Sequence, residues 1–122
     1  MRNVNNHTRV SISRIHFKKA VGGSCRLYSS LQRKFAERLD KDEKVESFET
    51  NHVLEDLSID GVYTSDFLVK YKDGNAKVFE CVLRRHILKP QTVKLLTISR
   101  NHWLSRGLKW GIVTEANNDE TI

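Results

Sequence analysis

The sequence predicts an α/β domain in which a mixed central β-sheet is flanked by helices. Leu31, Phe35 and Leu39 recur at four-residue intervals, which indicates an amphipathic helix. An Asp-Gly pair at 73–74 joins two apolar stretches and is the strongest hairpin signal in the chain. A second helix, beginning at Pro90, precedes a final apolar strand. Such a crossover makes the last strand parallel to its neighbour in the sheet, so the sheet is mixed.

The first half of the chain supplies an arm, a helix and short strands. Residues 1–24 alternate polar and basic groups with single apolar ones and end in a Val-Gly-Gly-Ser joint, so we expect a basic arm or loose strand there. The helix should span 29–39, behind serines that can cap it. Short strands are expected at 45–48 and 52–57, before a turn at 58–61.

The hairpin is expected to pair residues 63–71 with 76–83. Because successive side chains of a strand point to opposite faces, Glu80, Val82 and Arg84 should share one face of the return strand. Apolar residues at the alternate positions of both strands should face the core.

The second half of the chain closes a single domain. The helix that begins at Pro90 should run to about residue 106, with Gly107 placed to end it. We therefore expect one packed unit at 25–115, followed by a polar tail at 116–122.

Charge indicates contact with nucleic acid. The 122 residues carry 21 Lys and Arg against 15 Asp and Glu, a net charge of +6. The basic residues gather at 9–26, 33–44 and 84–94, whereas the acids cluster between 43 and 60. A basic surface of this kind attracts phosphates. The alternative interpretation is a merely basic soluble protein.

Cysteine content and hydropathy bear on location. Cys25 and Cys81 match no zinc or redox spacing, so we expect reduced thiols in a cytoplasmic protein. No apolar run approaches the roughly 18 residues of a membrane span, and residues 1–14 lack the apolar stretch of a signal peptide. We expect no membrane partner.

Two acids on the hairpin are candidate metal ligands. Counting back equally from the turn brings Asp66 and Glu80 nearly opposite each other. Carboxylates on adjoining strands can hold magnesium or manganese, and the metal can then polarise a phosphate and supply hydroxide. Acids that simply face solvent on one side of a sheet are the alternative.

Four stretches resemble a known family: YSSLQRKFAERLDKDEKVESFE, TSDFLVKYKDG, FECVLRR and LKPQTVKLLTISRNHWLSRGLKWGIVTE. They are similar to the N-terminal catalytic domain of TnsA-like transposon endonucleases, in the PD-(D/E)XK nuclease superfamily, and the resemblance as a whole extends over roughly residues 14–115. The resemblance implies a restriction-endonuclease-like core at 25–115. It also implies an enzyme that cuts the 5′ ends of a mobile element beside a DDE-type transposase or other transposition proteins.

Two of the three main catalytic positions depart from the family pattern. The resemblance places the family's aspartate on Asp66, its helix glutamate on Gln32 and its lysine on Val82. A glutamine amide carries no charge, and valine cannot donate a proton or stabilise charge on a phosphate. Ordinary nuclease activity should therefore be weak or lost.

A migrated site is the alternative. Glu80 could replace the missing helix carboxylate as a second ligand of magnesium or manganese, and Arg84 could reach a phosphate. The candidate catalytic set is thus Asp66, Glu80, Gln32 and Arg84, and the candidate metal ligands are Asp66 and Glu80. Candidate nucleic-acid contacts border this site: Arg84, Arg85, His86, Lys89, Lys94 and Arg33.

Three functional hypotheses follow. The first is a TnsA-like DNA-processing subunit of a transposition system that binds DNA ends and a transposase, with cleavage weak or lost. The second is an active metal-dependent endonuclease with a migrated site. The third is a non-catalytic regulator that competes with an active relative for its partner. Metal-dependent nicking distinguishes the second hypothesis from the other two.

Overall fold

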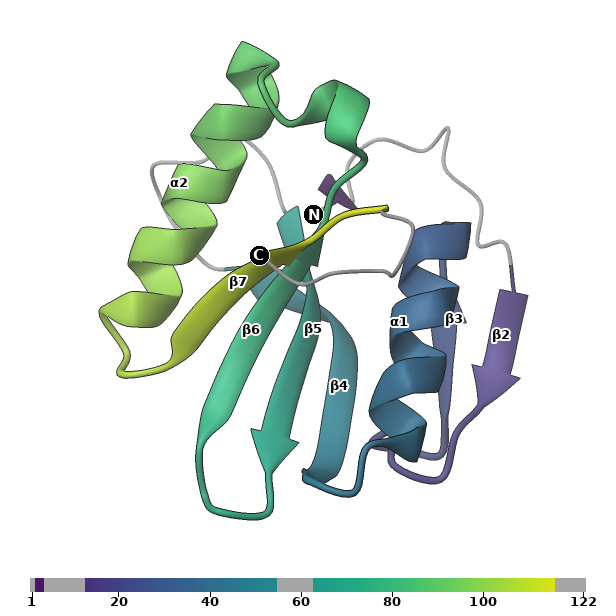
Figure 1. Cartoon of the computed structure of the whole chain (residues 1–122). Helices are drawn as coiled ribbons and strands as arrows, with labels where there is room; N and C mark the ends of the chain where they lie inside the picture. The colour runs from purple at the N-terminus through teal and green to yellow at the C-terminus, as the bar shows by residue number, and fades with distance from the viewer. Residues whose placement is uncertain (1, 4–12, 55–62, 116–122) are drawn as a thin grey trace.

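The structure, a computed structural model, describes residues 2–3, 13–54 and 63–115 (Figure 1). A five-stranded sheet contains the neighbours β4–β5–β6–β7, with β1 also paired to β5, and β2 and β3 form a separate two-stranded sheet. The strands are β1 (Arg2–Asn3), β2 (Ser13–His16), β3 (Ser24–Leu27), β4 (Val45–Leu54), β5 (Tyr63–Tyr71), β6 (Ala76–Cys81) and β7 (Lys109–Val113). The helices are α1 (Ser30–Lys41), the short 3₁₀ helix η1 (Arg84–His86) and α2 (Pro90–Leu104).

Helix α1 forms where the sequence predicts it. Ser29 caps its first turn by accepting a hydrogen bond from the Gln32 backbone N–H at 3.1 Å. The apolar side of the helix packs on one face of the sheet, where Phe35 lies edge-on to Phe67 and Phe79 at centroid distances of 5.1 and 4.9 Å. This contact fixes the start of α1 beside β5 and β6.

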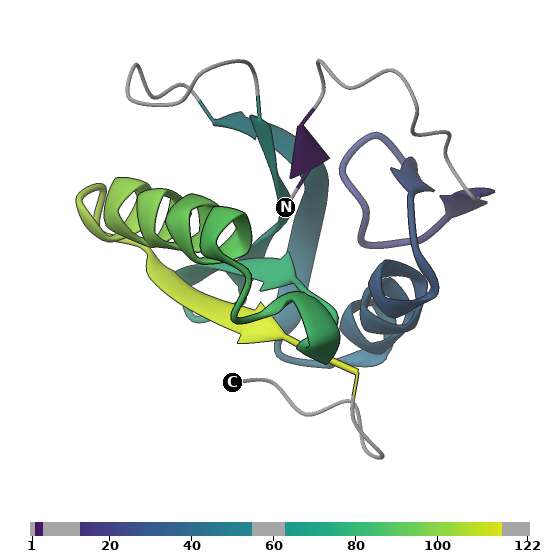
Figure 2. The same ribbon diagram turned by 90° about the horizontal axis from the view of Figure 1, so that it is seen from above.

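Helix α2 covers the opposite face of the sheet (Figure 2). Pro90 occupies the first turn, where its missing N–H costs no helical hydrogen bond. Trp103 packs there with Leu68 of β5 and Val78 of β6. Since Phe67 and Phe79 belong to the α1-side core, adjacent residues of both strands face different helices. The predicted α/β class, a mixed sheet flanked by helices, is confirmed.

The turn and crossover follow their sequence signals. Gly74 has φ 91° in the hairpin between β5 and β6, a conformation that favours glycine. Gly107 has φ 80° just beyond α2 and ends the helix. β7 then pairs parallel to β6, as the crossover predicts.

Three local features differ from the predictions. Residues 13–24, expected as part of a loose arm, belong to the β2–β3 hairpin at 13–27, whose loop residues Phe17 and Ala20 are buried in the α1-side core. The expected boundary at residue 25 thus lies inside this hairpin. The two short strands expected at 45–48 and 52–57 are one continuous strand as far as Leu54, and the turn expected at 58–61 lies outside the described residues.

The return strand of the hairpin is shorter than expected. β6 ends at Cys81, and the chain enters η1 at Arg84 instead of continuing to residue 83. α2 likewise ends at Leu104. Within the described residues, no helix has the length and apolar character needed to span a membrane.

Candidate functional site

Five chain segments meet at one end of the sheet. α1, η1 and α2 begin there, and β6 and β7 end there, at the upper end in Figure 1. Gln32 comes from the first turn of α1, Asp66 from the middle of β5, and Glu80 from the end of β6. The fold therefore collects the candidate catalytic residues at the end of the sheet where both long helices start.

The side-chain alternation of β5 shifts by one position at Asp66. Ser65 accepts a hydrogen bond from Trp103 on the α2 side of the sheet. Asp66 instead bonds Gln32 on the α1 side, and the next residue, Phe67, lies in the α1-side core. Two successive side chains thus point to the same face, which a regular strand does not allow. This shift directs the Asp66 carboxylate toward α1.

The neighbouring strand carries a matching irregularity. β4 pairs with β5 at Thr50 and at His52, but Asn51 between them has φ 55°, the left-handed region. Its side-chain amide donates a hydrogen bond to the Arg26 carbonyl at 3.0 Å. Asparagine tolerates this backbone conformation better than most residues. The site therefore lies beside a distorted segment of the sheet.

Both oxygens of Asp66 accept hydrogen bonds. Gln32 Nε2 donates to Oδ1 at 2.8 Å, and the Cys81 backbone N–H donates to Oδ2 at 2.7 Å. The orientation of the glutamine amide is fixed because the Tyr28 backbone N–H, which can only donate, bonds Gln32 Oε1 at 2.8 Å. Asp66 is 1% exposed and Gln32 7%. A neutral amide donor thus faces the carboxylate at the position where the resemblance places the family's glutamate.

The Glu80 carboxylate points to the other side of the sheet. Its Oε1 accepts from the Asp66 backbone N–H at 2.8 Å. Its Oε2 accepts from Ser65 Oγ at 2.8 Å and from Ser99 Oγ of α2 at 2.6 Å. Trp103 and Trp110 donate their indole N–H groups to Ser65 and Ser99, respectively. Glu80 therefore belongs to a buried network that connects the sheet to α2.

The two carboxylates replace the backbone ladder where the strands separate. Main-chain pairing between β5 and β6 ends at Phe67 and Phe79. One step further, the Asp66 side chain accepts from the β6 backbone, and the Glu80 side chain accepts from the β5 backbone. These reciprocal bonds satisfy two N–H groups that would otherwise be buried without partners.

Burial shapes the ionisation of this network. Desolvation raises the pKa of the fully buried Glu80 carboxyl, and the neighbouring Asp66 charge raises that pKa further. Desolvation, followed by the same Asp66 charge, also raises the pKa of the Cys81 thiol well above its ordinary value of 9.0. Cys81 is therefore a protonated thiol and a poor nucleophile.

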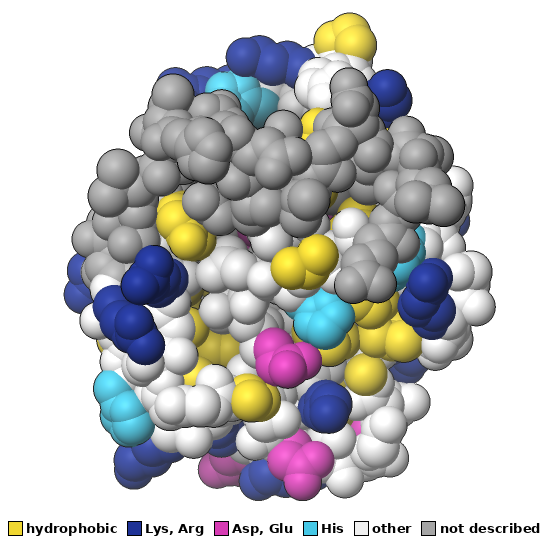
Figure 3. Space-filling model, turned by 180° about the vertical axis from the view of Figure 1, so that it is seen from behind, with side chains coloured by type: hydrophobic (Ala, Val, Ile, Leu, Met, Phe, Trp, Pro, Cys, Tyr) yellow, Lys and Arg dark blue, Asp and Glu magenta, His cyan; other side chains and the backbone are white. Residues whose placement is uncertain are grey.

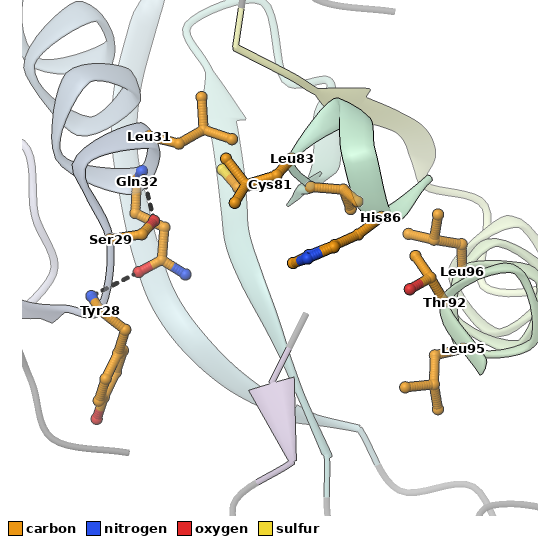
Figure 4. Close-up of a pocket in the computed structure, with 11 residues that line it drawn as sticks. Tyr28, Ser29, Leu31, Gln32, Cys81, Leu83, His86, Thr92, Leu95 and Leu96 are labelled. Atoms are coloured by element: carbon orange, nitrogen blue, oxygen red, sulfur yellow. Dashed lines mark hydrogen bonds between the residues drawn. The ribbon is translucent and has the colours of Figure 1, made fainter. Parts of the chain in front are cut away.

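A cavity of about 260 Å³ opens beside Gln32, between the start of α1 and the start of α2 (Figure 4). Val82 lies in its lining and is 8% exposed. The family pattern places a lysine at this position, but here the wall is apolar. His86 points into the same space from η1 (Figure 4).

The candidate nucleic-acid contacts surround this end of the sheet. Arg84, Arg85, Lys89 and Lys94 are exposed on η1 and the first turns of α2. Figure 3 shows Lys, Arg and His side chains along the upper edge of the molecule, the end at which η1 lies in Figure 1. Arg33, on α1, pairs with Glu37 at 3.1 Å. The Arg84 backbone N–H bonds Glu115 at 2.5 Å, while the Arg84 side chain is exposed.

The structure brings Asp66, Glu80 and Gln32 into one connected network; spacing on the hairpin predicted the nearness of the two acids, and the resemblance added Gln32. It directs the two carboxylates to opposite faces of the sheet, which spacing alone does not reveal. Sequence reasoning missed the polar partners Ser65 and Ser99. The polar run Thr64-Ser65-Asp66 within an otherwise apolar strand could have signalled Ser65, whereas nothing local in the sequence marks Ser99 of α2 as its neighbour.

The arrangement does not fit a divalent cation well. Magnesium and manganese prefer oxygen ligands, but Gln32 presents an N–H donor to Asp66. Glu80 faces α2 and accepts three hydrogen bonds there and from β5. Within the described residues, no group of three or more His, Cys, Asp and Glu could hold a metal ion. A metal at Asp66 and Glu80 stays a prediction.

These features define an α/β nuclease-like core with two acids on its central hairpin, a glutamine amide bonded to one of them, and an apolar wall at Val82. The family model described as TnsA-like endonuclease N terminal matches residues 31–115. The chain therefore belongs to the TnsA-like endonuclease N-terminal family. No curated protein matches the chain.

Proposed function

We propose that this chain is a DNA-processing subunit of a transposition system that acts in the cytoplasm, binds DNA ends and a DDE-type transposase partner, and cleaves DNA weakly or not at all. Membership of the TnsA-like family supports the connection to transposition and to DNA. The hydrogen bond from Gln32 to Asp66, 2.8 Å long, is the observation that carries the loss of cleavage.

The Gln32 amide supports this proposal because it holds the Asp66 carboxylate in place, as a bound cation would. A metal between two carboxylates neutralises their charges and fixes their positions. Gln32 needs no neutralisation, and its Nε2–H bonds the Asp66 carboxylate directly. Asp66 is thereby held in place without an ion, as a hydrogen-bonded link between α1 and β5.

Val82 supports the same conclusion independently. An apolar side chain next to the scissile phosphate cannot stabilise developing negative charge, and loss of one such donor costs on the order of 100-fold or more in rate. Arg84 follows in η1, beyond the end of β6, and its side chain is exposed. A migrated site would further require the Glu80 carboxylate to give up the hydrogen bonds that it accepts from Ser65 and Ser99.

DNA binding is supported by the charge at this end of the sheet. The first turns of α1 and α2 contain no acidic residue, and η1 consists of Arg84, Arg85 and His86. Phosphate contacts of this kind give affinity without reading sequence, and they weaken as salt increases.

Two assays test the proposal. Supercoiled DNA is incubated with the protein and magnesium or manganese, beside Asp66→Ala; we expect no nicking above the level of the variant. Nicking that requires both metal and Asp66 would instead establish the migrated-site endonuclease. Binding of a labelled duplex is measured over a salt series, and we expect log K to fall linearly with log salt concentration.

A matched pair of variants locates the DNA surface. Arg85→Ala with Lys89→Ala removes two charges beside η1, and we expect a weaker complex with a smaller salt slope. Lys41→Ala with Lys44→Ala removes the same charge from the other end of α1, about 18 Å away, and should change little. Equal losses in both pairs would contradict a specific surface.

Co-purification with a DDE-type transposase tests the proposed partner. If the chain and an active relative compete for the same transposase, the result would favour the hypothesis of a non-catalytic regulator.

A further inference from the structure

The cavity beside Gln32 has an apolar lining, here called its floor, whereas a phosphate site is polar. Its apolar lining comes from three elements and the segment after β6 and consists of Leu31, Cys81, Val82, Leu83, Leu95 and Leu96. Bare phosphate is strongly hydrated and gains nothing from such a surface. The volume, about 260 Å³, is slightly below the range of about 300–1,000 Å³ that holds drug-sized ligands. The cavity therefore suits a single small ring system.

Polar groups border this floor. Tyr28 and Ser29 lie at the α1 side, and His86 and Thr92 lie at the opposite side. Figure 4 shows the Gln32 amide nitrogen and the His86 ring pointing toward the space between the two helices. These groups can bond the edge of a planar heterocycle whose faces contact apolar side chains, which is how proteins hold an unstacked nucleobase.

The surroundings of the cavity favour a polyanion. Among the described residues, no Asp or Glu lines the cavity, while Arg84, Arg85 and Lys89 are exposed close to His86 in the chain. A nucleotide combines a planar base with a charged phosphate, so its base matches the apolar floor and its phosphate matches the exposed basic residues near His86. An apolar side chain of a protein partner would match only the floor.

We infer that this cavity receives one unpaired nucleobase at the end of a DNA substrate, while the η1 arginines hold the adjoining phosphates. The inference rests on the proposed DNA binding and specifies its substrate as an end with an unstacked nucleotide. Val82 is central to it, because a lysine there would fill this space with a charged chain, whereas valine leaves an apolar slot.

The test compares two labelled duplexes that carry the same charge. One ends in a single unpaired thymidine, and the other ends in an abasic nucleotide at the same position. We expect the wild-type protein to bind the first duplex on the order of tenfold more tightly, since contacts to one base are worth about that much. When 2-aminopurine takes the place of the unpaired thymidine, acrylamide should quench the fluorescence of this base less strongly once the protein has bound.

Variants in the first turn of α2 supply the control. Thr92→Phe fills the cavity and should abolish the preference for the base, whereas Gln91→Phe places the same ring on an exposed position outside the lining and should keep it. Equal binding of the two duplexes by the wild-type protein would overturn the inference and leave DNA binding intact. Binding of neither duplex at low salt would overturn the proposed function as well.

Discussion

Replacing Gln32 with glutamate tests the central structural argument. The change keeps the size and shape of the side chain and the oxygen that accepts from Tyr28. It replaces Nε2 with a second oxygen, 2.8 Å from Asp66 Oδ1. A charge-assisted hydrogen bond thus becomes a close contact between two buried carboxylates, which share one negative charge too many unless a proton or a cation lies between them.

The free-energy cost can be bounded. Losing a hydrogen bond to a charged group removes about 1.5–3 kcal/mol, and repulsion adds to this loss. Protonation limits the penalty, because adding a proton at pH 7 to a carboxylate with an ordinary pKa of about 4.3 costs roughly 4 kcal/mol. We therefore expect Gln32→Glu to lower the free energy of unfolding by about 2–4 kcal/mol at pH 7, or roughly 10 °C in Tm for a domain of this size.

Thermal unfolding in EDTA and in manganese provides the assay. Gln32→Glu should regain stability in manganese, and in EDTA it should regain stability as the pH falls toward 5 and the pair takes up a proton. The wild-type protein and the surface control Gln91→Glu should unfold at the same temperature with and without the metal. A variant as stable as wild type in EDTA at pH 7, or a manganese effect in wild type that Asp66→Ala removes, would refute the reasoning.

Three further substitutions test the surrounding network. Burial raises the pKa of Glu80, so the folded chain binds this proton more tightly than the unfolded chain, and the free energy of unfolding should fall as pH rises above about 4.5. Denaturant titrations at several pH values should show a smaller fall for Glu80→Gln. Ser99→Ala removes a donor to Glu80 and the acceptor for Trp110, and chemical denaturation should register a loss of about 1–3 kcal/mol, whereas an unchanged midpoint would contradict the network. Asn51→Ala should cost about 1–2 kcal/mol at φ 55°, and Asn51→Gly less, as measured by the same titrations.

Most of the fold was accessible from the sequence because its signals are local. The four-residue spacing of Leu31, Phe35 and Leu39 produced the buried side of α1, and Gly74 and Gly107 end their elements with positive φ. The β2–β3 hairpin was not predicted, because its burial depends on Phe17 packing against Phe48 of a distant strand. Local composition alone made that segment look like a loose arm.

The sequence by itself determined the α/β class and the hairpin with Asp66 and Glu80 on facing strands. Only the tertiary structure decided where the two carboxylates point. The alternation of β5 shifts at Asp66 because both neighbouring strands and both helices constrain it, and strand periodicity carries no information about such a shift. As a result Asp66 bonds the Gln32 amide on one side of the sheet, and Glu80 bonds Ser99 on the other.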